Sequence, residues 1–328
     1  MEQPDSRDEA IAWAWLSGGA ILEHDRCATS PEVGTPVRSP AKYGSAFAAL
    51  VLVACSLVNP PFPTPAPGSR SSFGSPSPSG DTRTSQGGQS TWWKPSLNLR
   101  WQWQLTDVPV DLDLDVDVYD VDLFDNDASV VEALHAQGRK VICYVSVGSW
   151  EDWRPDQGRF PASVIGREYE GWPGEKWLDI RQIETLAPIM RDRFDLCRDK
   201  DFDGVEPDNV DAYTNDTGFP LTYEDQLSYN LWLAQEAHAR GLSIGLKNDP
   251  EHVVDLLPYF DWALTEDCFA EGWCEDVSPF IQTGKPVLAA EYTDTGVILE
   301  QLCPEAARLG FNLILKNRDL DPWRQSCP

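Results

Sequence analysis

The chain has 328 residues, a formal net charge of −27 at pH 7 and 14 Trp. Such an excess of acidic groups argues against nucleic acid as a partner, because phosphates would be repelled, and it would attract a cationic polymer. Tryptophan at this density is frequent in carbohydrate sites, where flat rings stack on sugars, although Trp also fills large cores.

Residues 1–55 are predicted to be an N-terminal extension with a secretory signal peptide. Arg38 and Lys42 precede an apolar run at 46–54, which is too short to span a bilayer. The run ends in Leu-Val-Ala-Cys55, which resembles a bacterial lipobox, so Cys55 is a candidate lipid anchor. We therefore expect an extracytoplasmic protein of a bacterium, either secreted or a membrane-anchored lipoprotein. The alternative to a signal peptide is that the apolar run forms a buried helix.

Residues 56–91 are dominated by Pro, Ser, Gly and Thr, a composition that cannot bury enough apolar surface to fold. We expect them to be a disordered linker. The folded domain is predicted over 92–328, close in size to one TIM barrel.

Short β-branched runs alternate with amphipathic helical patterns in this domain, which is typical of parallel βα units. The fold class is therefore α/β, a single (β/α)8 TIM barrel. The predicted strands are 101–105, 116–124, 140–148, 204–209, 243–249, 262–267, 286–292 and 312–317. The predicted helices are 128–137, 183–200, 223–240, 252–259, 277–283 and 297–309. Residues 149–179 lack periodicity and are expected to form a long, functional loop over the barrel mouth.

Polar residues gather where the predicted strands end, and the C-terminal ends of barrel strands surround the active site. Glycoside hydrolysis needs two carboxyl groups that flank the scissile bond. The strand-end residues are Asp122, Asp125, Ser146, Glu206, Asp208, Asn209, Lys247, Asn248, Asp249, Glu266, Asp267, Glu291, Tyr292, Lys316 and Asn317.

Five segments together resemble glycoside hydrolase family 114, and the resemblance runs from about residue 93 to the C-terminus. They are Val-Ile-Cys-Tyr-Val-Ser-Val-Gly at 141–148, Trp-Leu-Asp-Ile-Arg at 177–181, Phe-Asp-Gly-Val-Glu-Pro-Asp-Asn at 202–209, Gly-Leu-Lys-Asn-Asp at 245–249 and Glu-Asp-Cys at 266–268. The resemblance implies a TIM-barrel endo-α-1,4-polygalactosaminidase. It also implies that Asp208 is the nucleophile and Glu266 the acid/base of a retaining mechanism.

Two alternatives stay open for these roles. Glu206 shares a strand face with Asp208 and could be the nucleophile, although Asp208 lies closer to the mouth. Glu291 could replace Glu266 as acid or base. The protein could also hydrolyse another α-linked glycan, or be a non-catalytic carbohydrate-binding lipoprotein.

Other residues are expected to bind the polysaccharide substrate, although Lys247 and Asp249 could instead neutralise neighbouring charges. Asp179 and Arg181 are expected to form an ion pair in the long loop. Of the loop residues Trp150, Trp153, Trp172 and Trp177, some would stack on sugars and others anchor the loop. The expected substrate-binding residues are Glu206, Asn209, Lys247, Asp249, Glu291, Tyr144, Asp125 and Trp172.

No cofactor or metal site is predicted. Nine aspartates fall between Asp107 and Asp127, but without EF-hand spacing a solvated acidic face is favoured over a calcium site. The six cysteines of the predicted domain fit three disulfides in an oxidising compartment. Of fifteen possible connectivities we favour Cys143–Cys197, Cys268–Cys274 and Cys303–Cys327. The sequence does not indicate an oligomeric state.

Overall fold

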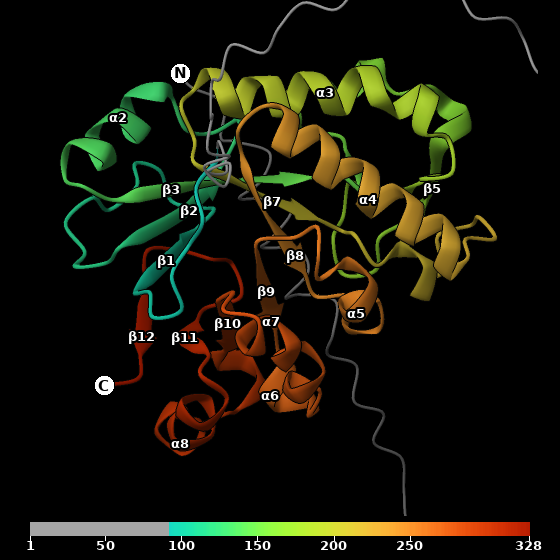
Figure 1. The fold of residues 1–328 in the computed structure, drawn as a ribbon. Coiled ribbons are helices and arrows are strands. Elements are labelled where there is room, and N and C mark those ends of the chain that lie inside the picture. Colours follow the sequence, from blue (N-terminus) through green and yellow to red (C-terminus); the bar gives the residue numbers. More distant parts are fainter. Residues whose placement is uncertain (1–91) are drawn as a thin grey trace, which may run out of the picture. The chain divides into compact units, whose positions relative to one another are not determined.

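The computed structural model describes residues 92–328, which form a nearly closed barrel-type sheet surrounded by helices (Figure 1). The predicted segments 1–55 and 56–91, including Cys55, lie outside the described residues. All eight predicted strands are present, and they pair in parallel in sequence order. They are β1 (Trp101–Gln104), β2 (Val118–Asp122), β3 (Lys140–Ser146), β7 (Gly204–Asp208), β8 (Ser243–Lys247), β9 (Trp262–Glu266), β10 (Val287–Tyr292) and β11 (Asn312–Lys316).

The first and last parallel strands do not form a common ladder. Instead β12 (Arg324–Ser326) pairs antiparallel with β11. Individual bonds join this edge to β1: the Trp101 indole donates to the Asn312 carbonyl at 2.8 Å, and the Leu105 amide donates to the Leu320 carbonyl at 2.9 Å. The gap between β11 and β1 is therefore bridged by side chains and by the C-terminal segment.

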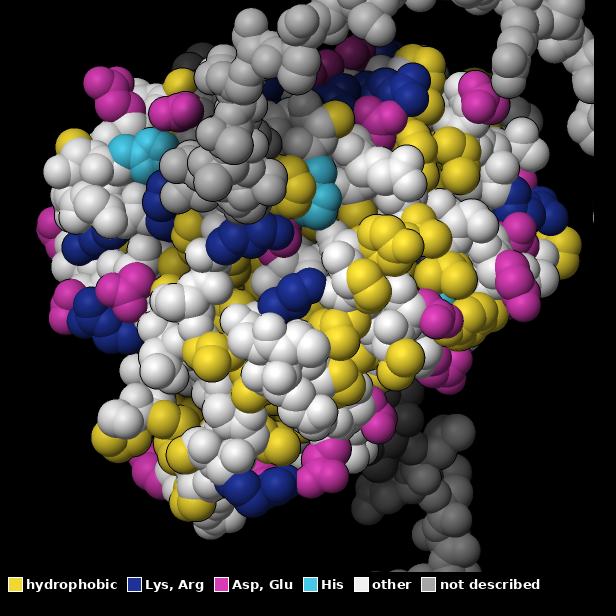
Figure 2. Space-filling model, in the orientation of Figure 1, with side chains coloured by type: hydrophobic (Ala, Val, Ile, Leu, Met, Phe, Trp, Pro, Cys, Tyr) yellow, Lys and Arg dark blue, Asp and Glu magenta, His cyan; other side chains and the backbone are white. Residues whose placement is uncertain are grey.

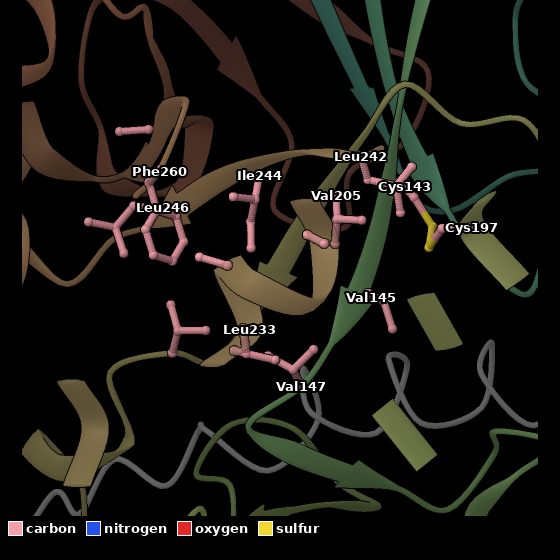
Figure 3. Packing of buried hydrophobic residues seen from close by; sticks show 14 of the residues in the cluster. Cys143, Val145, Val147, Cys197, Val205, Leu233, Leu242, Ile244, Leu246 and Phe260 are labelled. Atoms are coloured by element: carbon pink, nitrogen blue, oxygen red, sulfur yellow. A yellow bond between two sulfur atoms is a disulfide. The ribbon is translucent and has the colours of Figure 1, made fainter. Parts of the chain in front are cut away.

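The strands are apolar on both faces because each face is buried. Outward-facing residues such as Val205 and Ile244 pack against Leu233 of α4 (Figure 3). Inward-facing residues form a second cluster that includes Trp103 and Trp262. Gly245 makes room for this inner cluster, since a Cβ there would lie 2.4 Å from the Trp262 ring.

The predicted helices are present, with the 252–259 helix shortened and a short helix, α6, added. A capping box at Thr222 and Asp225 starts α4. No helix of residues 92–328 is both long and apolar enough to cross a membrane. The helices are α2 (Ala128–Ala136), α3 (Ile183–Asp199), α4 (Tyr223–Ala239), α5 (Val253–Leu256), α6 (Cys268–Glu271), α7 (Ser278–Gln282) and α8 (Leu299–Leu309).

The segment after β3 is more ordered than its sequence predicts. It contains a three-stranded antiparallel sheet, in the order β4 (Ser149–Glu151), β6 (Glu175–Leu178), β5 (Ile165–Glu168). These strands have only three or four residues, and the β5–β6 pairing shifts register, so no alternating pattern marks them in the sequence.

The three expected disulfides are confirmed: Cys143–Cys197, Cys268–Cys274 and Cys303–Cys327. The first ties β3 to α3 in the layer between sheet and helices (Figure 3). On the surface seen in Figure 2, Lys and Arg side chains are interspersed with Asp and Glu. The disulfides fit an oxidising, extracytoplasmic compartment.

Candidate active site

A cleft of about 1450 Å³ lies at the C-terminal ends of the strands. That is larger than most small-molecule pockets, which span roughly 300–1,000 Å³. Its lining includes thirteen Asp or Glu residues and three Lys or Arg residues. The cleft is therefore strongly acidic, and it has room for more than one sugar.

Lys247, the last residue of β8, joins the carboxylates at the floor of this cleft. Its Nζ lies 2.9 Å from Glu206 Oε1, 2.9 Å from Asp208 Oδ1 and 3.1 Å from Glu266 Oε2. Burial lowers the pKa of Lys247, but the charges of these three carboxylates outweigh burial and hold the pKa well above its usual value. These contacts support the alternative given for Lys247, that it neutralises neighbouring carboxylates.

Asp208 and Glu266 both face the cleft, with side chains 19% and 26% exposed. The Tyr144 hydroxyl donates to Asp208 Oδ2 at 2.9 Å. The Tyr292 hydroxyl donates to Glu266 Oε1, and Asn248 donates to Glu266 Oε2 at 3.3 Å. Each carboxylate is therefore held in orientation by donors on both oxygens.

The chain leaves the sheet sharply after three consecutive strands. Asn209, Asn248 and Asp267 follow β7, β8 and β9 directly, with φ of 63°, 48° and 53°. Asn and Asp tolerate this left-handed conformation better than most residues. A Cβ on Gly148 would lie 1.7 Å from the Asn209 carbonyl oxygen, so the turn after β7 also requires glycine at 148.

Glu206 lies on the same side of β7 as Asp208, as expected, but its side chain is fully buried below the cleft. Burial raises the pKa of Glu206 to about 7, with Lys247 opposing the shift. Asp120 of β2, which was not predicted as a site residue, is buried beside Glu206. Burial, then the charge of Glu206, raises the Asp120 pKa well above its usual value.

Asn209 lines the cleft, but its amide is committed to a buried network. Nδ2 donates to Ser146 Oγ, Ser149 Oγ and Glu175 Oε1 at 2.9, 3.1 and 3.0 Å. Burial, and then the charge of Glu151, raises the pKa of Glu175 to about 8. This network attaches the small antiparallel sheet to the end of β7.

Asp249 borders the cleft but is only 1% exposed. His252 Nδ1 lies 2.7 Å from its Oδ1, and Asn230 Nδ2 donates to its Oδ2 at 3.0 Å. Both oxygens of Asp249 therefore contact groups of the protein itself. This is in line with the alternative that Asp249 neutralises neighbouring charges instead of binding substrate.

Glu291 is fully buried and lies outside the cleft lining, contrary to the expectation of an acid, base or sugar ligand. Its neighbour Tyr292 faces the barrel interior, so alternation along β10 turns Glu291 outward. There its carboxylate accepts the amides of Phe269 and Ala270 at 2.8 and 3.1 Å.

Asp125 also lies outside the residues that line the cleft, so its expected substrate contact has no support. Its carboxylate is 3.9 Å from Arg154, which pairs more closely with Asp122 at 2.7 Å. These three residues form a cation–carboxylate cluster beside the cleft floor.

The tryptophans of the long loop differ in their exposure to the cleft. Trp172, which is 45% exposed, and Trp153 line the cleft, whereas Trp177 is buried. Two tryptophans that were not predicted as site residues also line the cleft: Trp103, inside the barrel below Lys247, and Trp273, which follows α6.

Two further expectations concern acidic residues away from the cleft floor. Asp179 and Arg181 form the expected ion pair at 2.7 Å. Asp111, Asp113 and Asp115 are exposed, as expected of a solvated acidic face.

Within residues 92–328, no group of His, Cys, Asp or Glu has the arrangement of a metal site.

Comparison with known proteins relates this cleft to carbohydrate-active enzymes. Residues 82–328 match the sequence model of a family described as glycoside-hydrolase family GH114. The crystal structure of Aspergillus fumigatus Ega3 in complex with galactosamine is similar, with 41% identity, a TM-score of 0.69, and coverage of 72% of this chain and 97% of that one.

Two more distant proteins are also similar. The glycoside hydrolase domain of PelA from Pseudomonas aeruginosa shares the fold at 15% identity and a TM-score of 0.54, covering 69% of this chain and 98% of that one. An uncharacterized protein of Deinococcus radiodurans is 25% identical over 232 residues, which are 61% of this chain and 73% of that protein.

Proposed function

The chain belongs to glycoside hydrolase family GH114, and from that premise we propose that it cleaves an α-1,4-linked galactosamine-containing polysaccharide by endo action. The protein is a glycoside hydrolase; the substrate, the retaining mechanism and the residue roles are our proposal. The galactosamine bound to Ega3 and the acidic cleft of this chain support an amino-sugar polymer as substrate. The size of the cleft supports the binding of several sugars at once.

The contact of one lysine with both candidate carboxylates carries the mechanistic proposal. Since Lys247 Nζ lies 2.9 Å from Asp208 Oδ1 and 3.1 Å from Glu266 Oε2, these two oxygens are at most about 6 Å apart. Retaining glycosidases place their carboxyl groups about 5–5.5 Å apart and inverting ones about 6.5–9.5 Å. The spacing supports retention.

In the proposed first step, an Asp208 oxygen attacks the anomeric carbon, forming a glycosyl ester, while protonated Glu266 transfers its proton to the departing glycosidic oxygen. In the second step, ionised Glu266 takes a proton from water, whose oxygen attacks the anomeric carbon and releases Asp208. Lys247 and Tyr144 hold Asp208 as an oriented carboxylate. The burial of Glu206 supports Asp208 rather than Glu206 as nucleophile, because a sugar must reach the attacking atom.

Hydrolysis of a deacetylated galactosamine polymer by the purified domain tests the proposal. We expect Asp208→Asn and Glu266→Gln to reduce release of reducing ends by at least about 1,000-fold while retaining polymer binding. Asp152→Asn, an exposed cleft carboxylate, is the matched control and should stay active. NMR of the first product should show an α-anomer. A β-anomer would refute retention, and full activity of either variant would refute that residue's role.

Salt tests the electrostatic part of the substrate proposal. Added salt should weaken action on the cationic polymer, because exposed charges attract at long range only when they are not screened. A rate independent of ionic strength would favour a different glycan as substrate. So would faster cleavage of a neutral α-glycan in a panel of polysaccharides.

We also propose the domain division 1–55, 56–91 and 92–328, with the last forming a (β/α)8 TIM barrel and Cys55 anchoring the mature protein as a bacterial lipoprotein. The three disulfides support export to an oxidising compartment. Mass spectrometry of the mature N-terminus tests this: a lipidated Cys55 is expected, and an unmodified residue 55 within a longer chain would refute it.

A further inference from the structure

The short segment that follows β9 brings an indole ring and a carboxylate into the cleft wall. Trp273 and Glu271 both line the cleft. The Trp273 indole donates from Nε1 to Glu271 Oε2 at 3.0 Å. The carboxylate therefore lies at the edge of the ring, and its position relative to the ring is fixed by this bond.

The protein holds this segment in place. The Cys268–Cys274 disulfide closes it over a separation of six residues. Buried Glu291 accepts two amides of α6 from the neighbouring strand, and the Phe269 ring packs edge-on against Phe311, with centroids 6.2 Å apart. A segment restrained in this way loses little conformational entropy when a ligand binds.

The described residues place no cation opposite the charge of Glu271. Among residues 92–328, no Lys, Arg or His forms an ion pair with Glu271. Its acidic neighbours differ: Asp267 pairs with Arg318 at 2.9 Å, and Glu275 pairs with Arg308. Glu271 is thus a cleft carboxylate that is still available to a cationic ligand.

We propose that Trp273 and Glu271 form a subsite that binds one unit of a polymer of 2-amino-2-deoxyhexose. The ring stacks on the apolar C–H face of the sugar, and the carboxylate pairs with its ammonium group. Glu271 lies five residues after Glu266, so their Cα atoms are at most about 18 Å apart, and one polymer chain reaches both. This inference rests on the proposed amino-sugar substrate. It adds a means by which the enzyme distinguishes sugars with a free amine from N-acetylated sugars.

Steady-state kinetics on a galactosamine polymer and on the same polymer after N-acetylation test the subsite. Glu271→Gln should raise KM for the amine polymer about twofold to fivefold, the size of an exposed ion pair, with kcat unchanged and no effect on the acetylated polymer. Trp273→Ala should raise KM for both about threefold to tenfold, because both sugars stack. Glu275→Gln and Trp323→Ala, exposed residues outside the cleft, are the matched controls.

Calorimetric binding of galactosamine oligomers to the Asp208→Asn protein, with and without each subsite substitution, separates the two proposals. If oligomers bind the Asp208→Asn protein but bind more weakly when Glu271→Gln or Trp273→Ala is added, the subsite is supported. Suppose that the native enzyme cleaves the polymer, but Glu271→Gln has the same KM values as Glu275→Gln or raises KM for both polymers equally. The subsite is then wrong and the proposed function stands. If the native enzyme neither binds nor cleaves amino-sugar chains, both are wrong.

Discussion

Lys247→Met removes the positive charge that three carboxylates share while keeping a side chain of similar length. Breaking a buried ion pair from one side costs about 3–5 kcal/mol. For a domain of this size, that corresponds to a fall in Tm of about 6–20 °C at neutral pH. Because Asp208 and Glu266 both lose the donor that positions them, we expect kcat to fall at least about 100-fold.

The Tm deficit of Lys247→Met should grow as the pH rises. Burial already raises the pKa of Glu206 to about 7, above its unfolded value of 4.5, so the folded protein binds this proton more tightly than the unfolded chain does. The stability that the proton contributes is fully present below pH 4.5 and disappears as pH rises through about 7. Without the opposing charge of Lys247 the Glu206 pKa rises further, so the Tm deficit of Lys247→Met should be larger at pH 8 than at pH 5.

Thermal unfolding between pH 5 and 8, with kinetics at each pH, measures both effects. Lys316→Met is the matched control, because Lys316 is also buried at the end of a strand but donates to the backbone oxygens of Asp321 and Trp323. This control should keep most of its activity. Because burial lowers the pKa of Lys316 to about 8, its Tm deficit should change only slightly between pH 5 and 8, and less than that of Lys247→Met. A Lys247→Met deficit that is independent of pH, or a variant that retains full activity, would refute the role assigned to the lysine.

Three further substitutions test other parts of the structure. Tyr144→Phe removes one hydrogen bond to Asp208, so kcat should fall about tenfold to 100-fold without change in Tm; an unchanged kcat would show that the bond is unimportant in the reaction. Asp120→Asn should retain most activity and stability, because burial raises the pKa of Asp120 and so favours its neutral acid, which an amide resembles; a large loss of activity at pH 7 would contradict this reasoning. Replacing Cys143 and Cys197 by Ser should lower the free energy of unfolding by about 4 kcal/mol, as expected for a loop of this length, and equal denaturation midpoints would contradict that estimate.

The sequence by itself determined the elements and the candidate carboxylates, because these depend on local patterns. Eight short predicted segments each contain a strand, and the polar residues that end β7, β8 and β9 meet in one cleft because parallel strands end at the same edge. The alternation of Glu206 and Asp208 correctly places both side chains toward Lys247. The disulfide between Cys268 and Cys274 followed from their short separation.

Only the tertiary structure decided which of these carboxylates a substrate can reach. Glu206 and Glu291 both stand near strand ends, but one lies below the cleft and the other points outward to hold α6, because burial and strand rotation depend on the whole barrel. Contacts between distant segments, such as those of Lys247 with carboxylates of two other strands or of Trp273 with the cleft, leave no local pattern in the sequence. The strand ends thus identified the candidates, and the packing of the barrel determined how they are arranged.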